Sequence, residues 1–188
     1  MLGKIGLNEA GVGVHLNILE HAGDRPGGVP VHAVLAQVLA TAHTLAEALA
    51  IIRSAPTSSS SVVTVVTAEA AVQVEIAGDA KRELRPGDPL PAGSPTSATD
   101  IADAGILIHT NHFLHPDLLD GAMELRPDST SQERYRHLAE AVVRFEAGRP
   151  RLVRFEAAAA IKAMLELAAG NLSQKELADW FRAHLLSP

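Results

Sequence analysis

The amino-acid sequence predicts an α+β fold in which antiparallel sheets are covered by helices. β-Prone runs occur in pairs that are joined by short turns, which is the pattern of antiparallel hairpins. Helical segments follow each group of strands instead of alternating with single strands, and this order disfavours a parallel sheet. The 188 residues are 47% hydrophobic and 20% charged, so we expect one domain over residues 1–188 with a substantial core.

The first hairpin is predicted over residues 4–19. Two β-prone runs flank Asn8-Glu-Ala-Gly11, a short connection whose glycine can take a positive φ. In the second run apolar residues alternate with small and polar ones, among them His15 and Asn17. One face of this strand therefore packs into a core, and the polar face suits the wall of a pocket.

A loop and two helices are expected next. Residues 23–30 are rich in Gly and Pro, which predicts a loop. Apolar residues then recur at helical spacing from residue 31 to residue 42. Thr44-Leu-Ala-Glu47 matches a capping box, so a second helix is expected to begin there and to end near Ser54.

The second hairpin is predicted at residues 62–67 and 71–76, two β-branched runs that a short polar turn joins. Residues 81–100 are rich in Pro, Gly and charge, so we expect a long surface loop there. Residues 105–108 form a short apolar run that we expect to be a buried strand.

Three helical segments complete the predicted order of elements. They cover residues 129–147, 153–169 and 174–186. Ser173 is the expected N-cap of the last helix, and Gly170-Asn171 is the expected C-cap of the helix before it.

The composition excludes several classes of protein. A net charge of −6 argues against a nucleic-acid partner, which would need a basic face. No apolar run reaches the ~20 residues that span a bilayer. The first residues also lack the pattern of a signal peptide, so we expect a cytoplasmic protein without a membrane partner. The sequence contains no cysteine, which excludes disulfides, thiolate metal sites and a cysteine nucleophile within these residues.

Residues 106–116 carry His109, His112 and His115 at three-residue spacing. Together with Asp117 they could ligate a catalytic zinc, which needs three protein ligands and an open position for water. If His109 continues a strand, however, His112 points to the opposite face. Pro116 then breaks the local structure that could bring His115 to the same side. The spacing is therefore a weak metal signal, and polar residues at a strand-to-loop corner are the simpler interpretation.

A serine nucleophile has little support. The chain lacks the Gly-x-Ser-x-Gly turn that exposes such a serine in α/β hydrolases. The serine run at residues 58–61 is typical of a turn before a strand, and Asp128-Ser129-Thr130 is typical of a helix start.

Four ordered blocks of the sequence together resemble one known family. The blocks are residues 3–17, Pro30-Val-His32, His109-Thr-Asn-His112, and Asp128-Ser129 with Arg134. They are similar to those of the acyl-coenzyme A:6-aminopenicillanic acid acyltransferase family of self-processing N-terminal-nucleophile hydrolases (peptidase family C45). The resemblance covers most of the chain, and the His-Thr-Asn-His block is its most specific part.

The resemblance implies a four-layer αββα sandwich of antiparallel sheets and helices. It also implies a precursor that cuts itself before a cysteine, whose thiolate then attacks an amide or thioester carbonyl. The free α-amino group of that cysteine acts as the base, with a pKa of about 7.7–8.0. The acyl group passes to water or to an acceptor amine. The expected partner is a small-molecule acyl substrate, with no cofactor, and acyl-coenzyme A would enter as a substrate.

The resemblance also assigns site residues. Asn111 is expected to donate to the oxyanion of the tetrahedral intermediate, because an amide is a fixed neutral donor. Asn17 and His15 are expected to line the substrate pocket, although for Asn17 a buried amide that bonds neighbouring backbone is an equal alternative. His109, Thr110 and His112 then support the Asn111 loop, and no metal is expected.

The chain departs from the family pattern at both ends. Family members carry the cysteine upstream of the Gly3-Lys-Ile-Gly6 block and continue beyond the helices into a block around Ile-Cys-Arg. We therefore expect a truncated central fragment that is inactive alone, with the missing N-terminal chain of the precursor as a partner. A catalytically dead binding or regulatory remnant and a His-ligated metallohydrolase are the alternatives.

Overall fold

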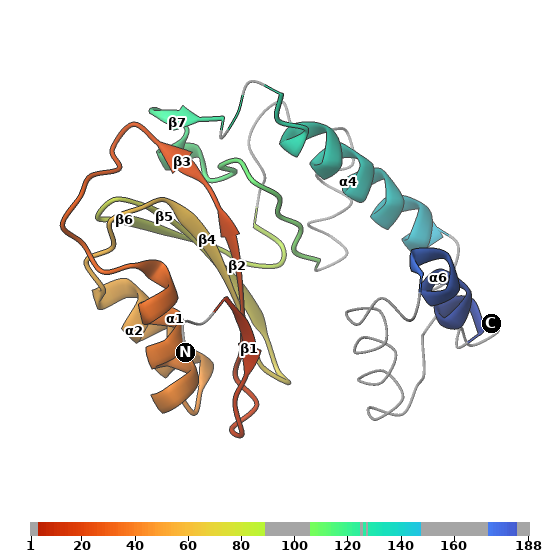
Figure 1. Ribbon diagram of the computed structural model, residues 1–188, viewed down its shortest axis with the longest axis horizontal. Helices are drawn as coiled ribbons and strands as arrows, with labels where there is room; N and C mark the ends of the chain where they lie inside the picture. Colours follow the sequence, from red (N-terminus) through yellow and green to blue (C-terminus); the bar gives the residue numbers. More distant parts are fainter. Residues whose placement is uncertain (1–3, 89–105, 125, 127, 148–172, 184–188) are drawn as a thin grey trace. The chain divides into compact units, whose positions relative to one another are not determined.

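The computed structural model, shown in Figure 1, divides into two compact units, residues 1–143 and residues 144–188, and each is considered by itself. The residues that the structure describes are 4–88, 106–124, 126, 128–147 and 173–183.

The first unit is built on a five-stranded antiparallel sheet with strand order β1-β2-β4-β5-β6. Its strands are β1 (Ile5–Leu7), β2 (Gly13–Ile18), β4 (Ser61–Val66), β5 (Ala71–Ala77) and β6 (Ala80–Leu84). Both predicted hairpins are confirmed, β1 with β2 and β4 with β5. Gly11 in the first connection has a φ of 82°, as its position requires.

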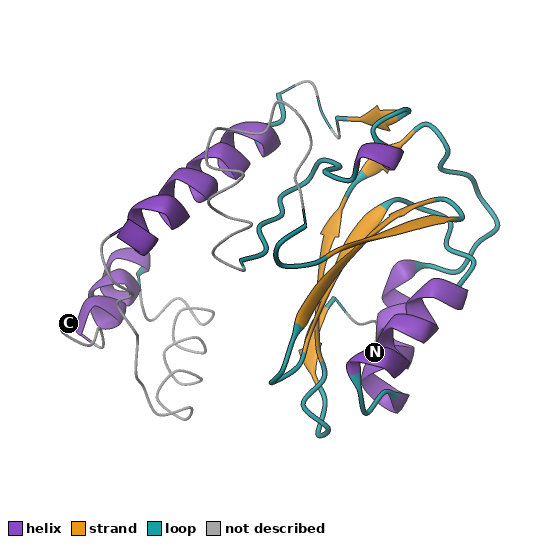
Figure 2. Cartoon of the chain, turned by 180° about the vertical axis from the view of Figure 1, so that it is seen from behind, coloured by secondary structure: helices purple, strands orange, loops and turns teal. Residues whose placement is uncertain are grey.

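One face of this sheet packs on helices α1 (Val31–Thr41) and α2 (Leu45–Ser54), as Figure 2 shows from behind. The alternation of apolar residues creates this face, because residues that pair across neighbouring strands share a side of the sheet. Val14 pairs with Val65, and Val65 pairs with Val72. The core therefore joins these valines to apolar side chains of both helices, among them Leu35, Val38, Leu49 and Ile52.

Helix α2 begins as the capping box predicts, with one difference. The Thr44 hydroxyl accepts a hydrogen bond from the Glu47 N–H at 3.2 Å. The Glu47 carboxylate accepts from the N–H of His43 at 2.8 Å, one residue before the position that the motif predicts. The first of these bonds satisfies an amide group that the first helical turn leaves without a partner, and the second fixes the residue before the N-cap.

The second face of the sheet carries polar residues where the first carries valines. Asn17 pairs with Val62, and Val62 pairs with Glu75, so these three residues form one row across the sheet. The segment that ends in the short 3-10 helix η1 (Pro116–Leu118) contacts this row. A small second sheet pairs β3 (Glu20–His21) with β7 (Ala122–Met123).

Strand β6 corrects the prediction of a loop from residue 81. Residues 81–84 belong to β6, which pairs with β5 from Gln73↔Leu84 to Ala77↔Ala80. The connection is Gly78-Asp79, and Gly78 has a φ of 57°, so this is the glycine-led two-residue turn of a hairpin. Charged side chains in β6 concealed the strand, because it lies at the edge of the sheet. Residues 89–100 of the predicted loop lie outside the described residues.

The strand predicted at residues 105–108 is wrong for its described part, because residues 106–108 are half-buried and belong to no sheet. This segment packs against the sheet through its side chains and does not pair with an edge strand. Leu107 and Ile108 pack against a small cluster of Leu84, Leu114 and Tyr135.

The helical predictions at the end of the chain hold where the structure describes them. Helix α4 (Ser131–Ala147) begins two residues later than predicted. Helix α6 (Gln174–Ala183), in the second unit, begins with a complete capping box between Ser173 and Glu176, with bonds of 3.2 and 2.7 Å. The helix predicted at 153–169 and its Gly170-Asn171 cap lie outside the described residues.

The α+β class, with antiparallel sheets and helices packed on them, is confirmed. The described residues show one helical layer against one large sheet, which is consistent with a sandwich, and the four-layer arrangement stays a prediction. No helix among the described residues is long and apolar enough to cross a membrane.

Candidate active site

A buried carboxylate on β5 organises the site. Val74 and Ile76 face the helices, so Glu75 between them points to the opposite side of the sheet, where it is 0% exposed. Its Oε1 accepts from His109 Nε2 at 2.7 Å and from the Leu114 N–H at 2.6 Å. Its Oε2 accepts from the His115 N–H at 2.9 Å. These bonds satisfy a charge that would otherwise be too costly to bury, and they attach the loop of residues 109–115 to the sheet.

His109 extends this anchor to the strand next to the pocket. Its side chain is 2% exposed, and its Nδ1 lies 2.9 Å from the carbonyl oxygen of Thr110. Both ring nitrogens therefore face acceptors, and a protonated ring satisfies both. The same Thr110 carbonyl accepts from Asn17 Nδ2 at 3.0 Å, so β2, β5 and the loop are joined through a few polar atoms.

Ser131, the first residue of α4, fixes the other side of the loop. Its buried Oγ accepts from the Asn111 N–H at 2.7 Å and lies 2.8 Å from His112 Nδ1. It also lies 3.0 Å from Thr110 Oγ1, which in turn donates to the Ser131 carbonyl at 3.0 Å. The start of α4 is therefore held to the Asn111 N–H and to the side chains of the residues on either side of it, Thr110 and His112.

His112 is kept neutral by its surroundings. The pKa of His112 is lowered from 6.5 to about 4, mainly by burial and also by the positive charges of His109 and Arg134, while Glu75 opposes these effects. The ring meets Tyr135 edge to face, with centroids 5.5 Å apart. A neutral imidazole in this position holds Ser131 and Thr110 without adding a charge to the site.

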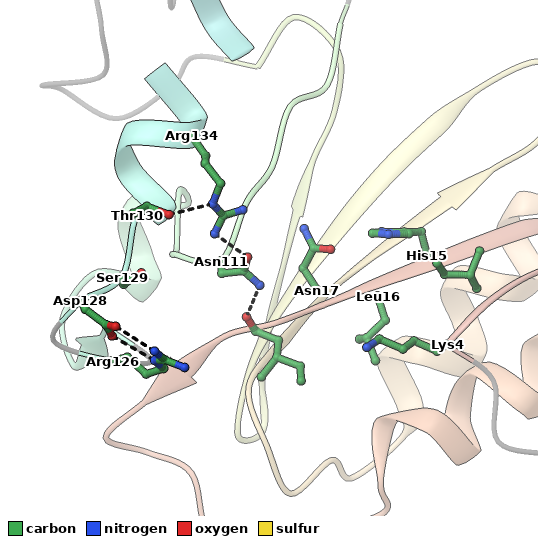
Figure 3. A pocket seen from close by; sticks show the side chains of 12 residues that line it. Lys4, His15, Leu16, Asn17, Asn111, Arg126, Asp128, Ser129, Thr130 and Arg134 are labelled. Atoms are coloured by element: carbon green, nitrogen blue, oxygen red, sulfur yellow. Dashed lines mark hydrogen bonds and ion pairs between the residues drawn. The ribbon is translucent and has the colours of Figure 1, made fainter. Parts of the chain in front are cut away.

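The Asn111 side chain is held at both ends of its amide, as Figure 3 shows. Nδ2 donates to the Ile18 carbonyl at 3.0 Å, and Oδ1 accepts from Arg134 Nη2 at 3.0 Å. Because a guanidinium can only donate, this contact assigns the oxygen of the amide to the Arg134 side. The NH₂ group is therefore directed toward the end of β2.

These side chains line an open pocket of about 720 Å³. Figure 3 shows Asn17 and His15 along β2, Lys4 beyond them, and Arg134 and Thr130 on the α4 side. Among the described residues the lining is Lys4, Ile5, His15, Leu16, Asn17, Ile18, Asn111, Arg126, Asp128, Ser129, Thr130 and Arg134.

The structure brings three of the predicted site residues, Asn111, Asn17 and His15, to this one pocket. The other three, His109, Thr110 and His112, do not line it and instead bond Glu75, Ser131 and each other behind it. The roles assigned to these six residues remain predictions.

Sequence reasoning missed three residues on which this arrangement depends: Glu75, Ser131 and Arg134. Glu75 had no local signal of burial, because apolar and polar residues alternate over residues 72–76, which is typical of an antiparallel strand with one face in solvent. Arg134 stood in the block that carried the family resemblance, but nothing local indicated its contact with Asn111. Ser131 had no signal beyond its place near a helix start.

The histidine stretch forms no metal centre in the part of the chain that the structure describes. His109 bonds Glu75 and His112 lies against Ser131, whereas His115 Nδ1 accepts from the Asp117 N–H at 3.2 Å. Among the described residues no group of three His, Cys, Asp or Glu side chains is arranged to hold a metal ion.

Two neighbouring side-chain amides and a guanidinium at an open pocket define a site that can bind a carbonyl group. Comparison with protein families adds the identity. The sequence model of the acyl-coenzyme A:6-aminopenicillanic acid acyl-transferase family matches residues 1–160. The chain therefore belongs to this family. A search of curated protein sequences gives no significant match.

The first prediction concerns the anchor of the loop. Glu75→Gln replaces one carboxylate oxygen by a donor that faces other donors, so at least one charged hydrogen bond is lost. We expect the free energy of unfolding to fall by about 1.5–3 kcal/mol for each such bond, measured by urea denaturation. The amides of Leu114 and His115 should also exchange faster with solvent.

The matched control is Glu83→Gln on the adjacent strand, where the carboxylate pairs with arginines at the surface. Its effect should stay within about 1 kcal/mol. Equal losses in the two variants would show that Glu75 does not anchor the loop.

The second prediction concerns pH. The pKa of His112 is lowered to about 4 in the folded chain against 6.5 ordinarily, so the unfolded chain binds more protons between pH 6.5 and 4. The free energy of unfolding should therefore fall as the pH is lowered through this window. His112→Gln should show a weaker fall. An NMR titration of the His112 ring should have its midpoint near 4, and a midpoint near 6.5 would show a solvated ring.

Proposed function

We propose that the chain supplies the carbonyl-binding part of an acyltransferase or amidohydrolase site that acts on acyl amides or acyl thioesters. The observation that carries this proposal is the fixed Asn111 amide at the pocket of a chain that belongs to an acyltransferase family. The substrate is a small acyl compound, no cofactor takes part, and acyl-coenzyme A would bind as a substrate.

Asn111 is suited to meet a developing oxyanion. A primary amide has two N–H groups, and the one bond that Nδ2 makes to the described residues, with Ile18, uses only one of them. The second N–H supports the proposed role, because a donor already held in place need not reorganise when charge develops on the carbonyl oxygen. Asn17 adds an amide on the same wall, although its Nδ2 also bonds Thr110.

The reaction of this class needs a thiol from outside these 188 residues, which contain no cysteine. We propose that self-cleavage of a precursor creates an N-terminal cysteine that completes the site. Its α-amino group takes the thiol proton, and the thiolate adds to the carbonyl to form the tetrahedral intermediate at Asn111. Collapse of the intermediate breaks the C–N or C–S bond, the leaving group takes the proton, and water or an amine then receives the acyl group.

A second candidate function follows from the same composition. A pocket that binds acyl compounds but has no nucleophile can serve as a binding or regulatory module of the same fold. The two functions differ in whether turnover appears when the 188 residues are expressed together with a cysteine-bearing N-terminal segment.

The third prediction is that the 188-residue chain alone does not turn over acyl amides or acyl thioesters. Covalent catalysis of this class requires the missing thiolate. The measurement is thiol release from acyl-coenzyme A and amine release from an N-acyl amide, each compared with a buffer blank. Turnover that Ser129→Ala abolishes would contradict the prediction, because it would place the nucleophile on a serine of the pocket.

The fourth prediction tests Asn111 in the polypeptide that also carries the cysteine. Asn111→Ala should lower kcat by about 10²–10³, the usual effect of losing one oxyanion donor. The ratio kcat/KM should fall in parallel, because the bond strengthens only as charge develops. Thermal melting of the variant should remain cooperative.

His115→Ala is the comparison variant, since this histidine lies outside the pocket and its side chain accepts a single N–H. It should change kcat by less than about tenfold. The reverse order, with His115→Ala inactive and Asn111→Ala mild, would contradict the proposed function and favour a metal enzyme.

A further inference from the structure

Arg134 differs from the other arginines whose side chains the structure describes. Six of these pair with a carboxylate: Arg25, Arg53, Arg82, Arg85, Arg126 and Arg136. Arg134 instead donates from Nε to Thr130 Oγ1 at 3.3 Å and from Nη2 to Asn111 Oδ1 at 3.0 Å, both neutral oxygens. Its positive charge therefore has no acidic partner among the described residues.

The balance of charge in the pocket follows from this difference. Of the side chains that line it, Lys4, Arg126 and Arg134 are cationic, and Asp128 is anionic. Arg126 and Asp128 satisfy each other through two hydrogen bonds of 3.0 and 2.8 Å. Among the described residues Lys4 and Arg134 have no carboxylate partner, so the described lining carries a net positive charge although the chain has a net charge of −6.

The position of Arg134 relates this charge to the carbonyl site. A guanidinium has five N–H groups in a planar fork that matches the two oxygens of a carboxylate. Two of them bond the neutral oxygens of Thr130 and Asn111, and these contacts orient the fork. An anion on the remaining N–H groups would lie next to a carbonyl group at Asn111, since the two side chains are bonded to each other.

Two exposed isoleucines add apolar surface to the pocket. Ile5 is 69% exposed and Ile18 is 47% exposed, and both line the pocket. Exposed isoleucines beside a polar centre suit the hydrocarbon part of an acyl group. One bound molecule can thus present a chain to the isoleucines, a carbonyl to Asn111 and an anion to Arg134.

We propose that the pocket selects acyl amides with a carboxylate beside the amide, as in N-acyl α-amino acids, and that Arg134 binds this carboxylate. The inference rests on the proposed function, because it takes Asn111 as the group that meets the acyl carbonyl. A carboxylate fits better than a phosphate, since the single guanidinium beside Asn111 balances one negative charge.

The test is a titration of the 188-residue chain, followed by NMR, with N-hexanoylglycine and with the neutral isostere N-hexanoylglycinamide. Both probes should shift the side-chain amide signals of Asn17 and Asn111. The carboxylate probe should bind at least about tenfold more tightly, the scale of a charged hydrogen bond. Its advantage should shrink as salt is raised.

Variants of α4 assign the effect to one side chain. Arg134→Gln should reduce the preference for the carboxylate probe to less than about twofold, and Arg134→Lys should retain part of it, because lysine keeps the charge and loses the fork. Arg136→Gln makes the same change of charge two residues further along the helix, where the arginine pairs with Glu140, and should leave the preference intact. Cooperative thermal melting of each variant shows that it is folded.

The outcomes separate this inference from the proposed function. Equal binding of the two probes, with shifts at Asn17 and Asn111, overturns the carboxylate preference and leaves the acyl pocket standing. An equal loss of the carboxylate preference in Arg134→Gln and Arg136→Gln overturns the role of Arg134. Tenfold tighter binding of the phosphonate analogue N-hexanoylaminomethylphosphonate than of N-hexanoylglycine overturns the choice of a carboxylate. Shifts at neither amide with any probe overturn the proposed function itself.

Discussion

The site of this protein depends on one buried carboxylate. Glu75 stands on the face of the sheet opposite the valine core, and its two oxygens accept from a histidine ring and two backbone N–H groups of the loop after residue 108. A carboxylate in this position is stable only while those three donors remain in place, because an unpaired buried charge is strongly unfavourable. The loop therefore has one favourable conformation over the sheet, and this conformation also fixes the side of the pocket that the loop forms.

Hydrogen bonds carry this order from Glu75 to the pocket in a few steps. His109 joins Glu75 to the Thr110 carbonyl, which also receives the Asn17 amide. Ser131 joins the Asn111 backbone to α4, and Arg134 on the same helix bonds the Asn111 side chain. The histidines of this stretch do not line the pocket, and the asparagine between the first two is the residue that reaches it.

The two faces of the sheet differ in character: one forms the apolar core, and the other carries the polar residues next to the pocket. The face that packs on α1 and α2 is composed of branched apolar side chains, and their burial supplies most of the driving force for folding this unit. The other face accepts polar residues at alternate positions of the same strands, where loops and the start of α4 satisfy them. Membership of an acyltransferase family fits this division, because an acyl-transfer site needs fixed polar donors on a rigid support.

Local patterns in the sequence determined the strands, the helices and the faces of the sheet. Period-two alternation placed Asn17 and His15 on a pocket wall, and the capping box at Thr44 and the N-cap at Ser173 marked where helices begin. The charged residues of β6 led to the wrong prediction of a loop, since a strand at the edge of a sheet can be polar. The apolar residues 106–108 led to the wrong prediction of a strand, since an apolar segment can also pack across a sheet. Only the tertiary structure decided that Glu75 meets His109, that Ser131 meets Asn111, and that Arg134 meets Asn111. These contacts join residues 20 or more positions apart, and no periodicity or short motif encodes which distant polar groups will satisfy one another once water is excluded.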